Sequence, residues 1–249
     1  MTTPSSSPLP APGAKAQSTS ANAWLFIDFD NTMMGTEFLA IPTLVDRFNQ
    51  LYGAKTAHLL TTEEFQEYFG GQARQSLCQN LSKHFGIDVI YEDLYDSREW
   101  RMMQALKTTP VQMAVGLIET LRASRERGLK LAFVSNNPIM RAFAAMRSAT
   151  NGQGEDLAAL FGTAYFEAGD IQKPKPDVYL RALEQVGADV ALSYAVEDSV
   201  SGVKAAVAAG LKTFGYTGFG NDPIKDQDKL IKAGAHACFS DWRDFLSMI

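Results

Sequence analysis

Residues 24–32 read Trp-Leu-Phe-Ile-Asp-Phe-Asp-Asn-Thr, an apolar run that is closed by two aspartates and a turn. The run Trp24–Ile27 predicts a buried strand. Strand alternation places the carboxylates of Asp28 and Asp30 on the same side, where their like charges repel unless a cation or a shared proton offsets them. This pattern suits a Mg2+ site in which one carboxylate remains free for chemistry.

Composition limits the class of protein. The 249 residues, 46% of them hydrophobic, are enough for one large domain or for a domain with an insertion. The formal net charge of -5 does not favour a nucleic-acid partner. The sequence has no apolar run near the ~20 residues that a membrane helix needs. The cysteines, Cys78 and Cys238, stand far apart in apolar contexts, which indicates reduced core thiols and a cytoplasmic protein.

The first residues differ in composition from the rest. Residues 1–22 are rich in Ser, Pro, Ala and Thr and contain almost no large apolar side chain. Such a segment cannot bury enough surface to offset the entropy of ordering, so a disordered tail is predicted. It also lacks the apolar segment of a secretory signal.

From Lys130 onward, strand and helix patterns alternate. Predicted strands cover 130–134, 164–166, 193–196, 212–216 and 236–239, and predicted helices cover 138–147, 176–186, 200–209 and 224–233. This alternation predicts an α/β fold, a Rossmann-like parallel-sheet core with helices on both faces. Ligands of such sheets bind beyond the carboxyl ends of the strands.

Residues 37–110 follow another pattern. Helical periodicity covers 39–52, 62–69, 74–85 and 91–107, and no convincing strand pattern interrupts it. An inserted all-helical cap domain over 37–110 is therefore predicted, with the core domain formed by 23–36 and 111–249. Both linkers lie next to the expected site, so the cap is expected to close over it and exclude water.

Polar clusters follow four of the predicted strands. They are Asp28 with Asp30, Ser135-Asn136-Asn137, Lys173-Pro174-Lys175-Pro176-Asp177, and Glu197-Asp198-Ser199. Each cluster alone could be a helix cap or a solvated loop. Their joint occurrence at successive strand ends is difficult to attribute to capping and indicates one site.

Phosphoryl chemistry explains these residue types. A phosphoryl group carries dense negative charge, so attack by a carboxylate needs a metal ion and a cationic side chain. Asp28 and Asp198 are the natural Mg2+ ligands, since Mg2+ prefers hard oxygen donors. The Ser135 hydroxyl can hold phosphate oxygens, and Lys173 can neutralise nucleophile and phosphate together. Asp30 can protonate the leaving oxygen and then deprotonate the attacking water.

The four motifs resemble those of the haloacid dehalogenase superfamily, in its phosphatase branch with a helical cap. The matching segments are 28–32, 134–137, 173–177 and 196–210, in the family's order, and the resemblance spans roughly residues 24–245. The subgroup that contains beta-phosphoglucomutase, phosphoglycolate phosphatase and sugar-phosphate phosphatases is the most similar. Asn31 replaces the subgroup's common glycine, and Asn also accepts a left-handed turn conformation.

The resemblance implies roles for individual residues. Asp28 matches the nucleophile and a Mg2+ ligand, and Asp30 matches the general acid/base, which also binds the metal through its backbone. Asp198 matches the remaining carboxylate ligand, with Glu197 a ligand or a partner of the ligands. The phosphate-binding positions correspond to Ser135, Asn136 and Lys173.

The resemblance also separates branches of the superfamily. Dehalogenases and phosphonatases lack a carboxylate at the position of Asp30, which argues against both activities. Beta-phosphoglucomutases carry a histidine in the hinge where this chain has Ala40. The segment 69–74 resembles a substrate-specificity loop, in which Arg74 is a candidate for binding an anionic group. His58, His84 and His236 are interpreted as surface or core residues.

The sequence thus predicts a Mg2+-dependent phosphatase that hydrolyses a small phosphorylated metabolite, a sugar or sugar-acid phosphate, through an aspartyl-phosphate. One alternative is a phosphosugar mutase of the beta-phosphoglucomutase type, and another is a non-catalytic protein that binds a phosphorylated metabolite. A cytoplasmic monomer or weak dimer is expected, without nucleic-acid or membrane partners.

Overall fold

The computed structural model describes residues 22–70, 72 and 74–249, and in the helix that begins at Arg74 the side chains of residues 74 and 75 are not described. The predicted tail therefore lies outside the described residues, apart from Asn22. Asn22 is attached to the core, because its carbonyl accepts a hydrogen bond of 2.9 Å from the backbone N–H of Asp189.

The described residues form a six-stranded parallel sheet in the order β3-β2-β1-β4-β5-β6. Its strands are β1 (Trp24–Ile27), β2 (Lys130–Ser135), β3 (Tyr165–Glu167), β4 (Tyr194–Glu197), β5 (Lys212–Tyr216) and β6 (Ala237–Phe239). The first strand lies between β2 and β4, with Phe26 opposite Ala132 on one side and Ala195 on the other. The chain order reverses at β1, and ligands of open α/β sheets bind at such a point.

Helices cover both faces of the sheet, as predicted. On one face, Leu25 and Ile27 pack with α6 (Leu117–Glu126), α7 (Ile139–Arg147), α8 (Gly154–Phe161) and α12 (Trp242–Phe245). On the other face, Phe26 packs with α9 (Asp177–Val186) and α10 (Val200–Ala208), and α11 (Pro223–Ala233) follows beside α10. The sequence alternation predicted α7, α9, α10 and α11, whereas it did not predict α6, α8 and α12.

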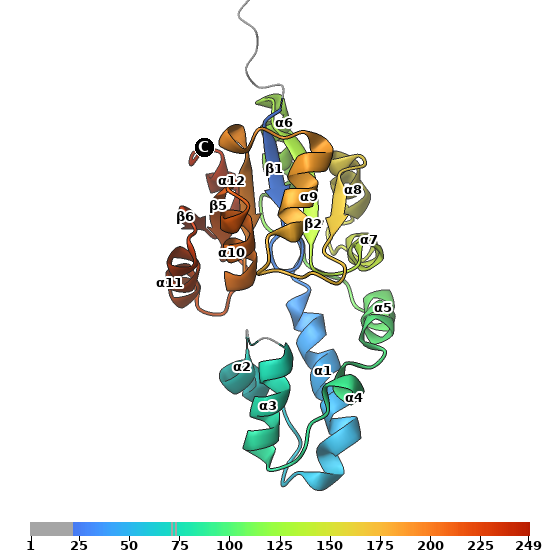
Figure 1. Cartoon of the computed structure of the whole chain (residues 1–249). Coiled ribbons are helices and arrows are strands. Elements are labelled where there is room, and N and C mark those ends of the chain that lie inside the picture. Colours follow the sequence, from blue (N-terminus) through green and yellow to red (C-terminus); the bar gives the residue numbers. More distant parts are fainter. Residues whose placement is uncertain (1–21, 71, 73) are drawn as a thin grey trace, which may run out of the picture.

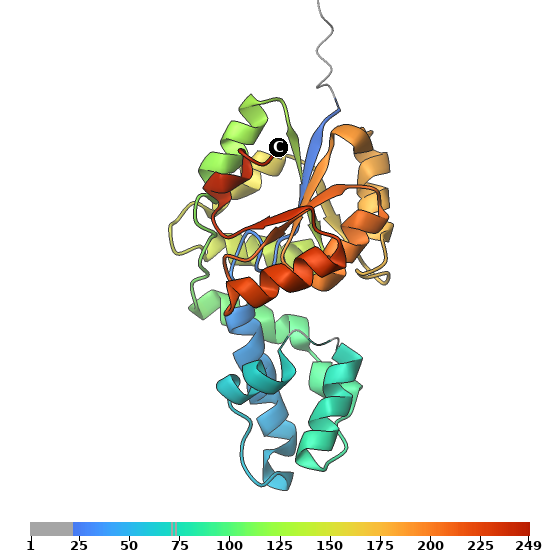
Figure 2. The same cartoon turned by 90° about the vertical axis from the view of Figure 1, so that its left-hand side faces the viewer.

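Between β1 and α6, the regular elements that the described residues form are helices. These are α1 (Glu37–Tyr52), the short 3-10 helix η1 (Gly53–Lys55), α2 (Thr62–Phe69), α3 (Arg74–Phe85), α4 (Tyr91–Tyr95) and α5 (Arg98–Thr108). Helices α1 to α4 share a second apolar core, which is formed by Phe48, Tyr52, Phe65, Leu81 and their neighbours. The buried residues of α5, Met102 and Leu106, pack instead in the core beside the sheet. Figures 1 and 2 show this group of helices beyond the carboxyl ends of the strands. The fold class is confirmed, while the division of domains at residues 36 and 111 stays a prediction.

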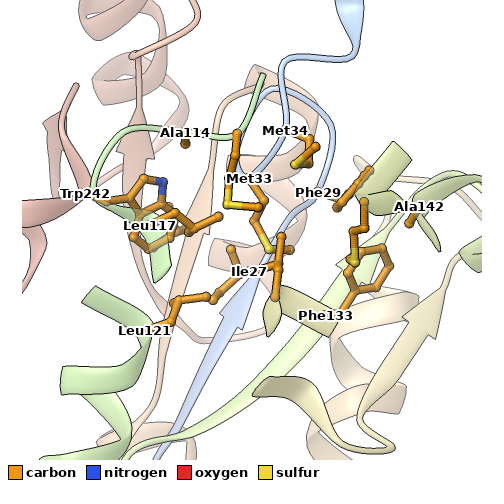
Figure 3. Close-up of a cluster of buried hydrophobic side chains, with 14 of the residues drawn as sticks. Ile27, Phe29, Met33, Met34, Ala114, Leu117, Leu121, Phe133, Ala142 and Trp242 are labelled. Carbon is orange, nitrogen blue, oxygen red and sulfur yellow. The ribbon is translucent and has the colours of Figure 1, made fainter. Parts of the chain in front are cut away.

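Buried side chains hold the loop after β1 in place. Phe29, Met33 and Met34 are buried in the core next to Phe133 and Trp242 (Figure 3). The indole N–H of Trp242 donates a hydrogen bond of 3.0 Å to the carbonyl of Thr32. The loop that follows the two aspartates is therefore rigidly anchored, which fixes the position of their carboxylates.

The turn at Asn31 is left-handed, with φ of 56°, a conformation that Asn tolerates better than most residues. Its side chain is bound to the start of α1, because its amide donates to the Glu37 carboxylate at 2.6 Å and its oxygen accepts from the Glu37 N–H at 3.1 Å. Asn31 therefore ties the aspartate loop to the first helix of the cap.

No helix in the described ranges is long and apolar enough to cross a membrane.

Candidate active site

Three of the predicted motifs meet at one buried ammonium group. Lys173 Nζ lies 2.6 Å from Asp28 Oδ1, 2.7 Å from Glu197 Oε1 and 3.1 Å from the carbonyl oxygen of Val134. These partners come from the ends of β1, β4 and β2. All three ammonium protons thus have an acceptor, which offsets the cost of burying the charge.

Electrostatics in this cluster keep the lysine charged. Burial alone would lower the pKa of Lys173, but the carboxylates of Asp28 and Glu197 raise it above its ordinary value. Burial, followed by repulsion from Glu197, raises the pKa of Asp28 to about 8, and Lys173 opposes this change. Burial and the charges of Asp28 and Glu197 also raise the pKa of Asp198 well above its ordinary value.

Glu197 is held through one of its two carboxylate oxygens. Besides Lys173, its Oε1 accepts a hydrogen bond of 2.5 Å from the hydroxyl of Tyr179 on α9. Its other oxygen, Oε2, has no hydrogen-bond partner among the described residues. That oxygen lies against Gly202, where a Cβ atom would stand only 1.8 Å from it. Glu197 is therefore suited to positioning Lys173, and a glycine at 202 leaves room for its carboxylate.

Asp198 lies on the other side of Asp28. The hydroxyl of Thr32 bridges the two, at 3.2 Å from Asp28 Oδ2 and 3.3 Å from Asp198 Oδ1. One carboxylate oxygen each from Asp28, Glu197 and Asp198 lie within 4.8 Å of one another. These three carboxylates outnumber the one ammonium group beside them, that of Lys173. Hard oxygen donors at this spacing fit a divalent ion such as Mg2+.

Asp30 has a separate set of partners. Its Oδ1 accepts a hydrogen bond of 2.5 Å from Thr36, and its Oδ2 accepts from Asn137 at 2.7 Å and Arg141 at 3.4 Å. Burial would raise the pKa of Asp30, but the charge of Arg141 and the hydrogen bonds from Thr36 and Asn137 hold it below its ordinary value. The two aspartates therefore have pKa values that are shifted in opposite directions, because Asp28 faces carboxylates whereas Asp30 faces Arg141 and hydrogen-bond donors.

Ser135 and Asn136 lie at the end of β2, as predicted. The hydroxyl of Ser135 accepts a hydrogen bond of 3.0 Å from the N–H of Asn137, the residue that also contacts Asp30. The side-chain oxygen of Asn136 accepts from the N–H of Lys173 at 2.9 Å, so this residue holds the lysine loop. Of the predicted site residues, only the side chain of Arg74 lies outside the described part of the chain.

Tyr179, Arg141 and Thr36 were not predicted from the sequence as parts of the site, and Thr32 was predicted only as a member of the segment 28–32, with no role of its own. Tyr179 and Arg141 lie on helices, where the sequence presents them as an ordinary core aromatic and a surface arginine. Arg141 is in fact buried and also donates to Glu99 of α5 at 3.0 Å. A buried arginine without a motif has no local sequence signal, and only the fold reveals its partners.

Comparisons with known proteins identify the family of this chain. Residues 25–216 match the model of the family described as haloacid dehalogenase-like hydrolase. The protein CbbY of Rhodobacter capsulatus is 26% identical over 195 residues, 76% of this chain and 82% of that protein. The phosphorylated carbohydrates phosphatase of Thermotoga maritima is 25% identical over 223 residues, 86% of this chain and 92% of that protein.

Solved structures show the same fold. A conserved haloacid dehalogenase-like protein of unknown function from Agrobacterium tumefaciens aligns with a TM-score of 0.73 and 23% identity, over 91% of this chain and 97% of that one. CbbY from Rhodobacter sphaeroides, solved with xylulose-(1,5)bisphosphate, aligns with a TM-score of 0.67 and 18% identity, over 89% and 95% of the two chains. With a family match over most of its length, this chain belongs to the haloacid dehalogenase-like hydrolases.

Proposed function

We propose that this enzyme is a Mg2+-dependent phosphatase that hydrolyses a small phosphorylated sugar or sugar acid through an aspartyl-phosphate on Asp28. The observation that carries the proposal is the contact of Lys173 with both Asp28 and Glu197 inside the carboxylate cluster. Family membership and phosphatase relatives support the hydrolysis of a phosphoric monoester. The xylulose-(1,5)bisphosphate bound to CbbY and the similarity to a phosphatase of phosphorylated carbohydrates favour a sugar-like substrate.

Each residue has a distinct task in this proposal. A carboxylate oxygen of Asp28 attacks phosphorus, and the leaving oxygen departs with a proton from Asp30. Asp30 then takes a proton from the water that attacks the aspartyl-phosphate, which frees inorganic phosphate and restores Asp28. Lys173 neutralises charge on the nucleophile and the phosphoryl oxygens, and Ser135 donates to one of those oxygens.

Asp28 and Asp198 would hold the Mg2+ ion, with Glu197 close enough to bind it or to position its ligands. When bound, the ion supplies positive charge that offsets the repulsion between the carboxylates and a phosphate.

The organic part of the substrate has a polar place to bind. A cleft of about 200 Å³ opens beside the Asp30 partner Asn137, and Asn136, Glu167 and Gln172 from the core line it together with Glu99 from α5. Polar and acidic side chains at this position suit hydroxyl groups better than an apolar leaving group. This lining supports a hydroxylated, sugar-like substrate.

The test is release of phosphate from a panel of hexose phosphates, 6-phosphogluconate, phosphoglycolate, glycerol phosphates and nucleotides, with Mg2+ or with EDTA. Asp28→Asn is expected to abolish release, and Asp170→Asn, an exposed aspartate after β3, is the matched control. Metal-dependent release that survives Asp28→Asn would overturn the aspartyl-phosphate mechanism. Conversion of beta-glucose 1-phosphate to glucose 6-phosphate without release would indicate the mutase instead. Binding without turnover would indicate a non-catalytic protein.

A further inference from the structure

A second cluster of side chains that carry potential metal ligands lies in the helical cap. His58 Nε2 and His84 Nε2 each lie 3.0 Å from the same oxygen of Glu64, Oε1. The three ligand atoms are all within 4.8 Å of one another. His58 belongs to the loop before α2, Glu64 to the first turn of α2, and His84 to the last turn of α3. Three segments of the cap therefore converge on one point.

From this geometry, we propose that His58, Glu64 and His84 form a Zn2+ site that clamps α2 to α3. Two imidazoles and one carboxylate with an open fourth position are a donor set that zinc binds well. A tetrahedral zinc ion with bonds of about 2.0–2.1 Å separates its ligand atoms by about 3.3 Å. The two nitrogen–oxygen separations of 3.0 Å are close to this value. The nitrogen–nitrogen separation can adjust, because the side chain of His58 is 56% exposed.

The surroundings prepare both imidazoles for this role. The ring of His84 packs against Phe69 and Phe85, with centroids 5.3 and 4.8 Å away, and the ring of His58 packs against Phe85 at 5.4 Å. These contacts limit the rotation of the His84 ring more than that of His58, whose side chain is more exposed.

This site differs in chemistry and in place from the catalytic carboxylates. The catalytic cluster offers oxygen atoms alone, which suit Mg2+, whereas the cap cluster offers imidazole nitrogen, which suits zinc. Figure 1 shows the end of α3, where His84 lies, away from the core, and the beginning of α3 toward the core. A zinc ion at the end of α3 that lies away from the core would hold α2 and α3 together. The opposite end of α3 faces the catalytic strands.

The experiment titrates Zn2+ into metal-stripped, tag-free protein in excess Mg2+, so that the catalytic carboxylates are already occupied. Calorimetry is expected to give one zinc equivalent in the wild type and in Asp28→Asn. His58→Ala and His84→Ala are each expected to weaken binding at least tenfold. His236→Ala is the matched control, because this exposed histidine packs on Phe214, near Cys238 and outside the cluster. It is expected to retain full binding.

A second measurement tests the clamp. Zinc is expected to slow amide hydrogen exchange in α2 and α3 of the wild type and to leave exchange in His84→Ala unchanged. Circular dichroism without zinc establishes that each variant is folded. Absence of zinc binding by the wild type, or equal binding by the His58 and His84 variants, would overturn the site. Binding without slower exchange in α2 and α3 would overturn the clamp.

Discussion

Replacement of Gly202 by alanine tests the placement of Glu197 most sharply. Gly202 is the third residue of α10, inside a helix, where alanine is intrinsically favoured over glycine by about 1 kcal/mol. Helix propensity alone therefore predicts that Gly202→Ala stabilises the protein. The structure predicts the opposite, because the new Cβ would stand 1.8 Å from Glu197 Oε2 and 2.1 Å from its Cδ.

The magnitude follows from what Glu197 would lose. Real Cβ contacts essentially never fall below 3.0 Å, so the carboxylate must move by more than an ångström. Such a shift breaks its hydrogen bonds to Lys173 and Tyr179, which are all buried. Loss of a buried charged partner typically costs about 3–5 kcal/mol, and the propensity gain recovers about 1 kcal/mol. The expected net loss is about 2–4 kcal/mol in the free energy of unfolding.

Urea denaturation measures this loss, and steady-state kinetics measure its effect on the site. Since Lys173 loses one of its anchors, kcat is expected to fall by about 10²–10³, the range for a misplaced electrostatic group. Lys204→Ala, at an exposed position of the same helix, is the control and should change neither quantity by much. A Gly202→Ala protein as stable and as active as the wild type would refute the buried position of Glu197.

Two further predictions concern charge in the site. Arg141→Gln removes the cation that lowers the pKa of Asp30, so the acid limb of the kcat profile against pH is expected to move to higher pH. Arg147→Gln, at the exposed end of α7, is the control and should leave the acid limb in place. An unchanged acid limb in Arg141→Gln would contradict the contact between Arg141 and Asp30. Metal-free protein is expected to lose stability as pH rises from 3.8 to about 8, because Asp28 ionises in the unfolded chain before it does so in the folded one. Mg2+ should remove this loss in denaturation curves, whereas identical curves in EDTA and Mg2+ would contradict a cation at Asp28 and Asp198.

The fold was largely predictable because its strands are buried parallel strands with strong local signals. The runs at 24–27 and 131–134 are apolar, and glycines or prolines mark the ends of several helices. The short helix α8 gave no such signal, since it begins at Gly154, a residue that helices disfavour. The structure explains that glycine, because a Cβ there would stand 1.6 Å from the carbonyl oxygen of Met146.

The candidate site was predictable where motifs follow strands and unpredictable where helices reach into it. Parallel strands gather their carboxyl ends at one edge, so Asp28, Lys173 and Asp198 could be placed together from order alone. Tyr179 and Arg141 depend on the rotation and packing of α9 and α7, which sequence spacing does not determine. The cap histidines are likewise 26 positions apart, a spacing that matches no local metal motif.

Arg141 joins the chemistry of the core to the position of the cap. Its guanidinium group is shared between Asp30 of the core and Glu99 of α5, at 3.4 and 3.0 Å. The charge of Arg98, on the same helix α5, also lowers the pKa of Asp30. A movement of α5 away from the core would therefore remove both a cation that lowers this pKa and the carboxylate that partly neutralises Arg141. The contacts of Arg141 with Asp30 and Glu99 thus couple the electrostatics at Asp30 to the position of α5.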